Sequence, residues 1–251
     1  MAPEPGPGAG LTPDAGGPDP PGRGVRVLLL DSGVEAGHPD LGGWPVETLG
    51  LEGGTGSWRV LPEAPLDTFG HGTAIAALVR ALAPGVRLTS LRILGQDLRA
   101  GTERVRFALR WGLDQGFEIV NCSFGSSARQ DLGDFKQLVD RAFCRNTWIV
   151  AASSNLDPGL EEYPGAFPSV FTVTSADLDD PDALVRRPGE LTEFAAHGAN
   201  VRVAWREGGH RILTGSSFAA PRLTALLARL RSVRPGWNAC EAKAWLYGRC
   251  R

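Results

Sequence analysis

The segment VRVLLLDSG at residues 25–33 sets the framework for the whole chain. Its first six residues are nearly all apolar, as in a strand that is buried on both faces of a parallel sheet. The strand ends at Asp31, and a carboxylate there lies at the carboxyl edge of the sheet, where open α/β folds place their binding sites. Taken alone, Asp31-Ser32-Gly33 fits an ordinary turn that closes a strand as well as it fits a functional site.

Apolar segments of strand length alternate with longer amphipathic segments along the chain. The predicted strands are residues 25–30, 87–93, 119–123, 148–152, 170–174 and 201–204. The predicted helices are residues 71–82, 102–115, 133–145, 217–233 and 239–247. This alternation predicts an α/β fold with three layers, in which helices cover both faces of a doubly wound, mostly parallel sheet. The segments 42–64 and 155–168, rich in glycine and proline, are predicted to be surface loops.

The first 23 residues differ in composition from the remainder. More than half of them are proline or glycine, which cannot form a packed core, so we predict a disordered leader at 1–23 and one folded domain at 24–251. The leader has no cationic start and no hydrophobic stretch, unlike a secretory signal, which predicts a cytoplasmic protein. The chain has four cysteines, which are Cys122, Cys144, Cys240 and Cys250. They show neither metal-type spacing nor a dense disulfide pattern, which is typical of proteins in a reducing compartment.

The bulk composition narrows the range of partners. The chain has 251 residues, 42% of them hydrophobic, which is enough for one substantial core. Its formal net charge is -2, so no basic field attracts nucleic acid or an anionic membrane. The longest apolar run, residues 25–30, is far too short to span a bilayer. We therefore expect neither nucleic acid nor a membrane as partner.

Two further motifs supply the chemistry that Asp31 alone lacks. His71, in FGHGTAIAALVRALAPG, stands where apolar periodicity begins a helix, and the helix dipole there favours the neutral imidazole of a general base. Ser217, in GSSFAAP, opens another helix, where a serine is often no more than an N-cap. Its small neighbours leave room for a substrate chain. The other histidines lack this context and are expected to make local hydrogen bonds: His38, His197 and His210.

The acid, the base and the nucleophile follow one another along the chain as Asp31, His71 and Ser217. Several unrelated folds share such a triad, and this order is the one found in subtilisin. On these motifs the chain resembles the subtilisin-like serine proteases over roughly residues 25–246. The resemblance implies a serine endopeptidase that acts on a peptide or protein substrate. Ser217 would attack the carbonyl, His71 would transfer the proton, and Asp31 would orient the imidazole.

The same resemblance assigns residues around the triad. WIVAASSN resembles the strand that carries the asparagine of the oxyanion hole, which falls on Asn155, although SSN replaces the usual Ala/Gly-Gly-Asn. In GFEIVNCSFGSS, the residues Ser123, Phe124 and Gly125 correspond to the segment that pairs with extended substrate.

The segment YPGAFPS at 163–169 resembles the family's segment beside the specificity pocket. That pocket binds the substrate side chain that precedes the scissile bond. The alignment puts Glu162 at the floor of that pocket. A carboxylate in a partly dehydrated pocket favours a substrate cation, so Lys or Arg would be preferred over Phe or Leu. The alternative is that Glu162 points to solvent beside Glu161 on a charged loop.

A metal site is not expected. Asp40 matches a calcium ligand of the family, but the helix that begins at His71 runs straight into Ala83-Pro84-Gly85 without the inserted loop that supplies the other ligands. Because Ca²⁺ takes six or more oxygens, a lone carboxylate does not hold it tightly. We therefore predict no metal and no other cofactor.

Three alternatives remain beside the hydrolase. A transpeptidase or macrocyclase would use the same triad with a peptide amine as acceptor, and a degenerate protease would act as a binding or scaffold protein. Nucleotide binding is disfavoured because neither G-x-G-x-x-G nor a P-loop follows the first strand. Among hydrolases, a compact chain without obvious accessory domains suggests a dedicated peptide-maturation protease.

Overall fold

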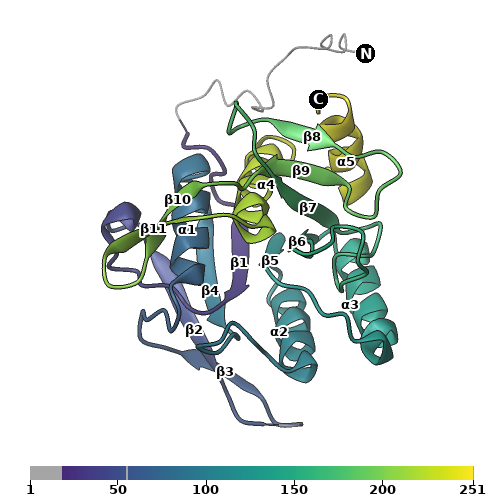
Figure 1. The fold of residues 1–251 in the computed structure, drawn as a ribbon. Coiled ribbons are helices and arrows are strands. Elements are labelled where there is room, and N and C mark those ends of the chain that lie inside the picture. The colour runs from purple at the N-terminus through teal and green to yellow at the C-terminus, as the bar shows by residue number, and fades with distance from the viewer. Residues whose placement is uncertain (1–18, 55, 251) are drawn as a thin grey trace.

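The computed structural model describes residues 19–54 and 56–250, and nine strands of this part form one sheet in the order β3-β2-β4-β1-β5-β6-β7-β9-β8 (Figure 1). Its strands are β1 (Arg26–Asp31), β2 (Val46–Glu52), β3 (Arg59–Pro62), β4 (Arg87–Arg92), β5 (Ile119–Cys122), β6 (Trp148–Ala152), β7 (Phe171–Ala176), β8 (Leu184–Arg186) and β9 (Phe194–His197). A separate hairpin contains β10 (Val201–Trp205) and β11 (Gly209–Leu213). The helices are α1 (His71–Leu82), α2 (Thr102–Asp114), α3 (Leu132–Cys144), α4 (Ser216–Val233) and α5 (Ala239–Tyr247), with short 3₁₀ turns at Pro39–Leu41 and Arg129–Asp131.

The middle of the sheet is parallel, and β1 lies between β4 and β5. The pairs β5–β6, β6–β7, β7–β9 and β2–β4 are also parallel, whereas the edge pairs β2–β3 and β8–β9 are antiparallel. The chain therefore winds to one side of β1 and then to the other. This confirms the doubly wound, mostly parallel sheet and puts the switch point at the carboxyl ends of β1 and β5.

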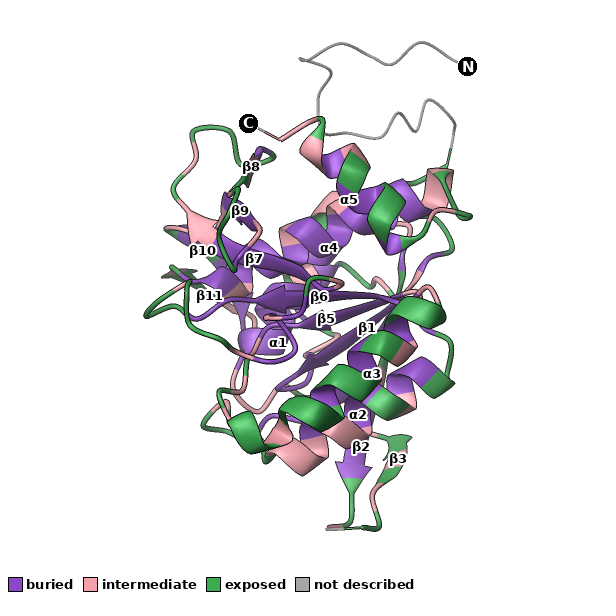
Figure 2. Ribbon diagram, turned by 90° about the vertical axis from the view of Figure 1, so that its right-hand side faces the viewer, coloured by how far each residue is buried: buried purple, intermediate pink, exposed green. Residues whose placement is uncertain are grey.

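Helices cover both faces of the sheet, as predicted (Figure 2). Residues of β1 alternate between two cores: Val27 and Leu29 belong to the core under α1, α4 and α5, and Leu28 and Leu30 to the core under α2 and α3. All four are at most 1% exposed. Because successive side chains enter opposite cores, the strand is apolar without interruption. In the described residues no helix is long and apolar enough to cross a membrane.

Two segments differ from the prediction. Residues 42–64 contain β2 and β3 instead of one long loop. Glycine at 50, 53 and 54 and the half-exposed face of this sheet edge hide the strand signal, although Leu49 and Leu51 are buried. The predicted strand at 201–204 exists, but it pairs with β11 in the separate hairpin beside α1 and does not join the main sheet.

The folded part begins earlier than residue 24. The Gly85 N–H donates to the carbonyl of Pro21 at 2.8 Å, and the Arg23 N–H donates to that of Pro20 at 3.1 Å. Gly22 is buried, and a Cβ there would lie 2.8 Å from the Val86 side chain. The last residues of the predicted leader are therefore packed, and residues 1–18 lie outside the described part of the chain.

Candidate active site

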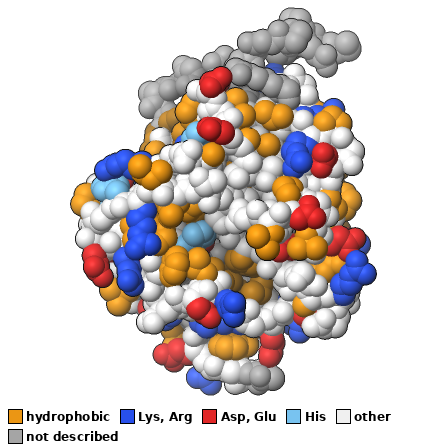
Figure 3. All heavy atoms as spheres, in the orientation of Figure 1, with side chains coloured by type: hydrophobic (Ala, Val, Ile, Leu, Met, Phe, Trp, Pro, Cys, Tyr) orange, Lys and Arg blue, Asp and Glu red, His pale blue; other side chains and the backbone are white. Residues whose placement is uncertain are grey.

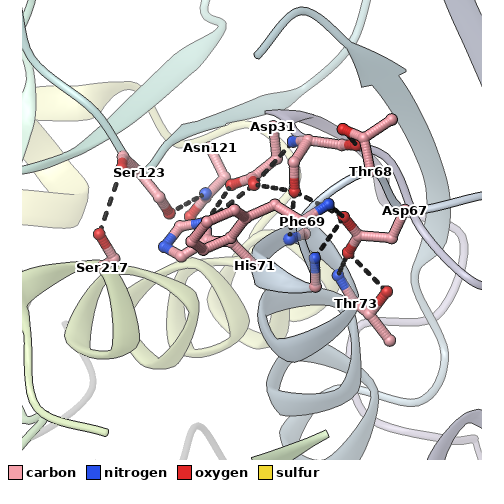
Figure 4. Close-up of polar contacts among 12 residues, drawn as sticks. Asp31, Asp67, Thr68, Phe69, His71, Thr73, Asn121, Ser123 and Ser217 are labelled. Carbon is pink, nitrogen blue, oxygen red and sulfur yellow. Dashed lines mark hydrogen bonds and ion pairs between the residues drawn. The ribbon is translucent and has the colours of Figure 1, made fainter. Parts of the chain in front are cut away.

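Asp31, the last residue of β1, and His71, the first residue of α1, face each other at the switch point (Figure 4). The Nδ1 atom of His71 lies 2.8 and 3.0 Å from the two carboxylate oxygens of Asp31. Asp31 is fully buried and His71 is 6% exposed. Since an ionised carboxylate accepts hydrogen bonds and cannot donate them, Nδ1 carries the proton, and Nε2 is the basic nitrogen.

The close approach of α1 to β1 explains the glycine that follows His71. A Cβ at Gly72 would lie 2.0 Å from the carbonyl oxygen of Gly33, a distance that no side chain tolerates. Gly33 itself has a φ of 104°, a conformation that favours glycine. The glycines of the two motifs therefore allow the acid and the base to meet.

Asp67, which sequence reasoning missed, holds the first turn of α1. One of its oxygens accepts the backbone N–H groups of Phe69 and Gly70 at 3.0 and 2.7 Å and the Ser32 hydroxyl at 2.8 Å. The other accepts the N–H and the hydroxyl of Thr73 at 2.8 and 2.7 Å. Asp67 thus satisfies the Thr73 N–H in the first turn of α1 and the N–H groups of the two residues before the helix, and it ties α1 to the end of β1.

The carboxylates also determine the basicity of His71. Burial lowers the pKa of the imidazole, but the charge of Asp31, its hydrogen bond and the charge of Asp67 together outweigh burial, so the pKa lies above its ordinary value. The two carboxylates therefore act in the direction opposite to the helix dipole, which favours the neutral imidazole.

Ser217 lies in the first turn of α4, beside the imidazole. The next residue, Phe218, has its ring centroid 5.8 Å from that of His71. The Ser217 hydroxyl donates to the backbone carbonyl of Ser123 at 3.2 Å, and in the described residues no hydrogen bond joins it to His71. Such bonds are often long or absent without substrate and tighten when it binds. The structure thus brings the three predicted residues to one place and turns the hydroxyl toward β5.

A second residue that sequence reasoning missed is Asn121 of β5, which is fully buried. Its amide nitrogen donates to the Ser123 hydroxyl at 2.8 Å, and its amide oxygen accepts the Thr224 hydroxyl of α4 at 2.8 Å. This chain of hydrogen bonds fixes the end of β5 against the helix that carries Ser217. A polar residue in an otherwise apolar strand was the available signal.

Asn155 follows β6 and points its amide oxygen at the start of α4. That oxygen accepts the Ser216 backbone N–H at 2.7 Å and the Ser216 hydroxyl at 3.0 Å. Because an N–H pairs with the oxygen and not with the NH₂ group, the orientation of the amide is determined. Its NH₂ group has no hydrogen-bond partner in the described part of the chain and can donate to another acceptor. The helix N-terminus at Ser217 presents a backbone N–H close by.

Glu162 lies against the segment that is expected to bind substrate. Ser126 and Tyr163 pair through backbone hydrogen bonds of 3.0 and 2.8 Å, which brings the two segments together. A Cβ at Gly125 would lie 2.6 Å from the Glu162 carboxylate, so the bare backbone of Gly125 faces that side chain. The predicted residues Ser123, Gly125 and Glu162 therefore share one side of the site, where Phe124 is half-buried.

The two neighbouring glutamates differ in their surroundings. Glu161 is exposed and pairs with Arg129 at 3.4 Å. Glu162 is half-buried, and burial raises the pKa of its carboxyl. Within residues 19–54 and 56–250, no hydrogen bond or ion pair compensates it. Glu162 thus does not simply point to solvent beside Glu161.

Asp40, the candidate calcium ligand, is occupied by protein groups. Its carboxylate oxygens lie 2.9 and 3.0 Å from Nε2 of His210, and its backbone N–H donates to the His38 ring at 3.1 Å. No group of three or more His, Cys, Asp and Glu side chains that could hold a metal occurs in the part of the chain that the structure describes.

Comparison with known proteins assigns this chain to one family. The model of the Subtilase family matches residues 22–248. Subtilisin BL and Subtilisin Savinase, both from Lederbergia lenta, are each 28% identical to this chain over 228 residues, which cover 86% of this chain and 80% of theirs. The solved structure of the S41 psychrophilic protease superposes with a TM-score of 0.72 at 25% identity, covering 89% of this chain and 82% of that chain.

The chain therefore belongs to the subtilase family. It is a subtilisin-like serine endopeptidase, a hydrolase whose substrates are peptides or proteins.

Proposed function

We propose that Asp31, His71 and Ser217 are the catalytic triad of this endopeptidase. The observation that carries the assignment is the buried pair of Asp31 and His71, whose Nδ1 and carboxylate atoms are 2.8 Å apart, with the first turn of α4 beside the imidazole. This pair leaves Nε2 of His71 as a base of raised pKa on the side of Ser217.

In the first half of the reaction, His71 Nε2 takes the proton of the Ser217 hydroxyl as Oγ forms a bond to the substrate carbonyl carbon. The Asn155 NH₂ group and the Ser217 backbone N–H stabilise the negative oxygen that develops. His71 then gives its proton to the leaving amine, and the C–N bond breaks. His71 then takes a proton from a water molecule, whose oxygen attacks the acyl carbon. The bond from that carbon to Ser217 Oγ breaks as His71 gives the proton to Oγ, which releases the acid product and restores the enzyme.

The substrate binds as an added strand beside residues Ser123, Phe124 and Gly125. The backbone groups of this segment are the hydrogen-bonding partners, and its side chains add little restriction at Gly125. Bound substrate also frees the Ser217 hydroxyl from its hydrogen bond to the Ser123 carbonyl. A substrate N–H donates to that carbonyl instead, and the hydroxyl turns to His71.

We infer further that Glu162 selects Lys or Arg before the scissile bond. A half-buried carboxylate without a partner is costly, and a substrate cation restores the missing charge. Glu162 lines a cavity of about 10 Å³ together with Ala152, Gly165 and Ala166. Because this volume is too small for a Lys or Arg side chain, the Glu162 side chain turns when such a cation enters. We expect an ion-pair preference of about tens- to hundreds-fold in kcat/KM over Phe or Leu.

Such a preference suits a protease that matures one dedicated peptide, because a required cation restricts the bonds that can be cut. We place this activity in the cytoplasm. The four cysteines, all described, are free thiols, as is common in a reducing compartment.

Mass spectrometry of the products of matched peptides with Lys, Arg, Phe or Leu before one bond tests the proposal. We expect two linear fragments whose summed mass exceeds that of the substrate by one water, formed fastest from the Lys and Arg peptides. Ligated or cyclic products would favour the transpeptidase alternative, and tight binding without turnover would favour the binding protein.

A further inference from the structure

A second cavity opens beside the segment that leads into His71. It holds about 300 Å³ and is lined by Thr68 and Phe69 before α1, Gln96 after β4, and Trp205, Arg206 and Arg211 of the β10–β11 hairpin. Neither the triad nor the Glu162 pocket uses these residues. The cavity is therefore a distinct feature on the imidazole side of the site.

Aromatic contacts connect the cavity to the base. The rings of Phe69 and Trp205 meet edge to face, with centroids 5.5 Å apart. A Cβ at Gly70, the residue before His71, would lie 2.6 Å from the Trp205 ring, so the backbone rests directly on the indole. The cavity floor and the start of α1 are thus one packed unit, and a group bound on this floor lies close to the reacting atoms.

The rim of the cavity is basic. The Arg211 guanidinium lies 4.6 Å over the Trp205 ring, and no ion pair engages it in the described residues. Arg206 donates to the carbonyl of Thr68 at 3.5 Å and meets Glu207 at 4.0 Å, in a solvent-exposed pair of little strength. Figure 3 shows basic side chains gathered over this hairpin. Arg211, which has no ion pair in the described part of the chain, and Arg206, which has only a weak one, lie above an aromatic floor. This arrangement suits an anion with a short apolar stem.

We propose that this cavity binds an acidic side chain of the peptide substrate, adjacent in sequence to the residue that occupies the Glu162 pocket. In an extended peptide, successive side chains point to opposite faces. When one side chain points at Glu162, its two neighbours in sequence point the other way, toward the His71 side. The inference rests on the proposed function, which it extends to a substrate with an acidic and a basic residue side by side.

Two pairs of peptides, each with Arg before the scissile bond, test the inference. One pair has Glu or Gln immediately before the Arg, and the other has Glu or Gln immediately after the bond. At one of these positions we expect the Glu peptide to exceed the Gln peptide about five- to tenfold in kcat/KM, and the ratio to shrink at high salt. Arg206→Gln/Arg211→Gln should bring the ratio to about one.

Two variants control for indirect effects. Arg202→Gln changes an exposed cation of the same hairpin outside the cavity and should keep the wild-type ratio, and Arg211→Lys should keep a part of it. A Glu-to-Gln ratio near one at both positions, or a ratio that survives Arg206→Gln/Arg211→Gln, would overturn the inference.

Binding to the Ser217→Ala protein separates this inference from the proposed activity. Calorimetry of that variant should show tighter binding of the Glu peptide than of the Gln peptide at the same position. If wild-type protein hydrolysed none of the peptides while this difference persisted, the proposed activity would fail and the cavity assignment would stand. Equal binding of Glu and Gln peptides would reject the cavity assignment even if hydrolysis were observed.

Discussion

Asp67 caps the helix turn that begins at His71, and its negative charge adds to that of Asp31 in raising the His71 pKa. One carboxylate contacts the imidazole, and the second acts through the backbone and through space. A general base works only when it is neutral, so activity is lost on acidification at a higher pH than for an ordinary histidine. Asp67 is therefore a positioning residue whose effect can be measured separately from that of Asp31.

We expect Asp67→Asn to move the acidic limb of the kcat/KM profile to lower pH. Loss of the charge lowers the His71 pKa, so the base stays neutral to lower pH. An amide also accepts fewer of the hydrogen bonds that the carboxylate holds, which should lower the free energy of unfolding by about 1–3 kcal/mol. Asp140→Asn, in an exposed pair with Lys136, is the control. An unmoved limb would show that Asp67 is purely structural.

The preference for Lys and Arg should depend on the protonation of Glu162. Burial raises the pKa of this carboxyl, so the preference is greatest above that pKa and fades as the pH falls through it. Glu162→Gln should remove the preference at all pH values, whereas Glu161→Gln, at the paired and exposed neighbour, should leave it unchanged. Kinetics with matched Arg and Leu peptides measure both. If Leu is the better substrate for wild-type protein, the pocket is assigned wrongly.

Asn155→Ala should lower kcat by about 10²–10³, the loss typical of one oxyanion donor, with little change in KM. Ser216→Ala should have a smaller effect, because it removes one of the two groups that orient the Asn155 amide. Leu156→Ala is the matched control, since Leu156 is 96% exposed next to Asn155. A kcat for Asn155→Ala within a few-fold of wild type would remove Asn155 from the mechanism.

Removal of divalent cations should leave stability nearly unchanged. The Asp40 carboxylate pairs with His210, and a ligand stabilises a protein only in proportion to its binding to the folded state. We expect excess chelator to shift the melting temperature of the protein by at most a few degrees in a calorimetric scan. A fall of about ten degrees or more would reveal a calcium site and contradict the prediction.

The sequence identified the residues whose role follows from neighbours along the chain. Asp31, His71 and Ser217 each stand at a strand end or helix start with glycine or small residues beside them, and the structure places all three at one switch point. The helix limits were also predicted to within about two residues, and in α1, α2 and α3 the apolar periodicity is strong. These features need no knowledge of distant contacts.

Other features depend on residues far away in the chain. The hydrogen bond that ties Asp67 to the turn after β1 comes from the distant Ser32, and Asn121 gains its partner only when Thr224 of α4 approaches. The raised pKa of His71 is a balance between burial and two charges, which local sequence does not give. The strand β2 gains its parallel partner from β4, and the edge strand β3 pairs with β2, so the composition of residues 42–64 alone did not predict either strand.

Reaction with a fluorophosphonate, followed by peptide mapping, tests the central claim most directly. Such a reagent phosphonylates a serine only when a base and an oxyanion hole activate it. We predict one adduct, on Ser217, that forms in the wild-type protein, is absent in Ser217→Ala, and is strongly slowed in His71→Ala. No adduct on folded wild-type protein, or an adduct on another serine that survives Ser217→Ala, would contradict the assignment of the triad.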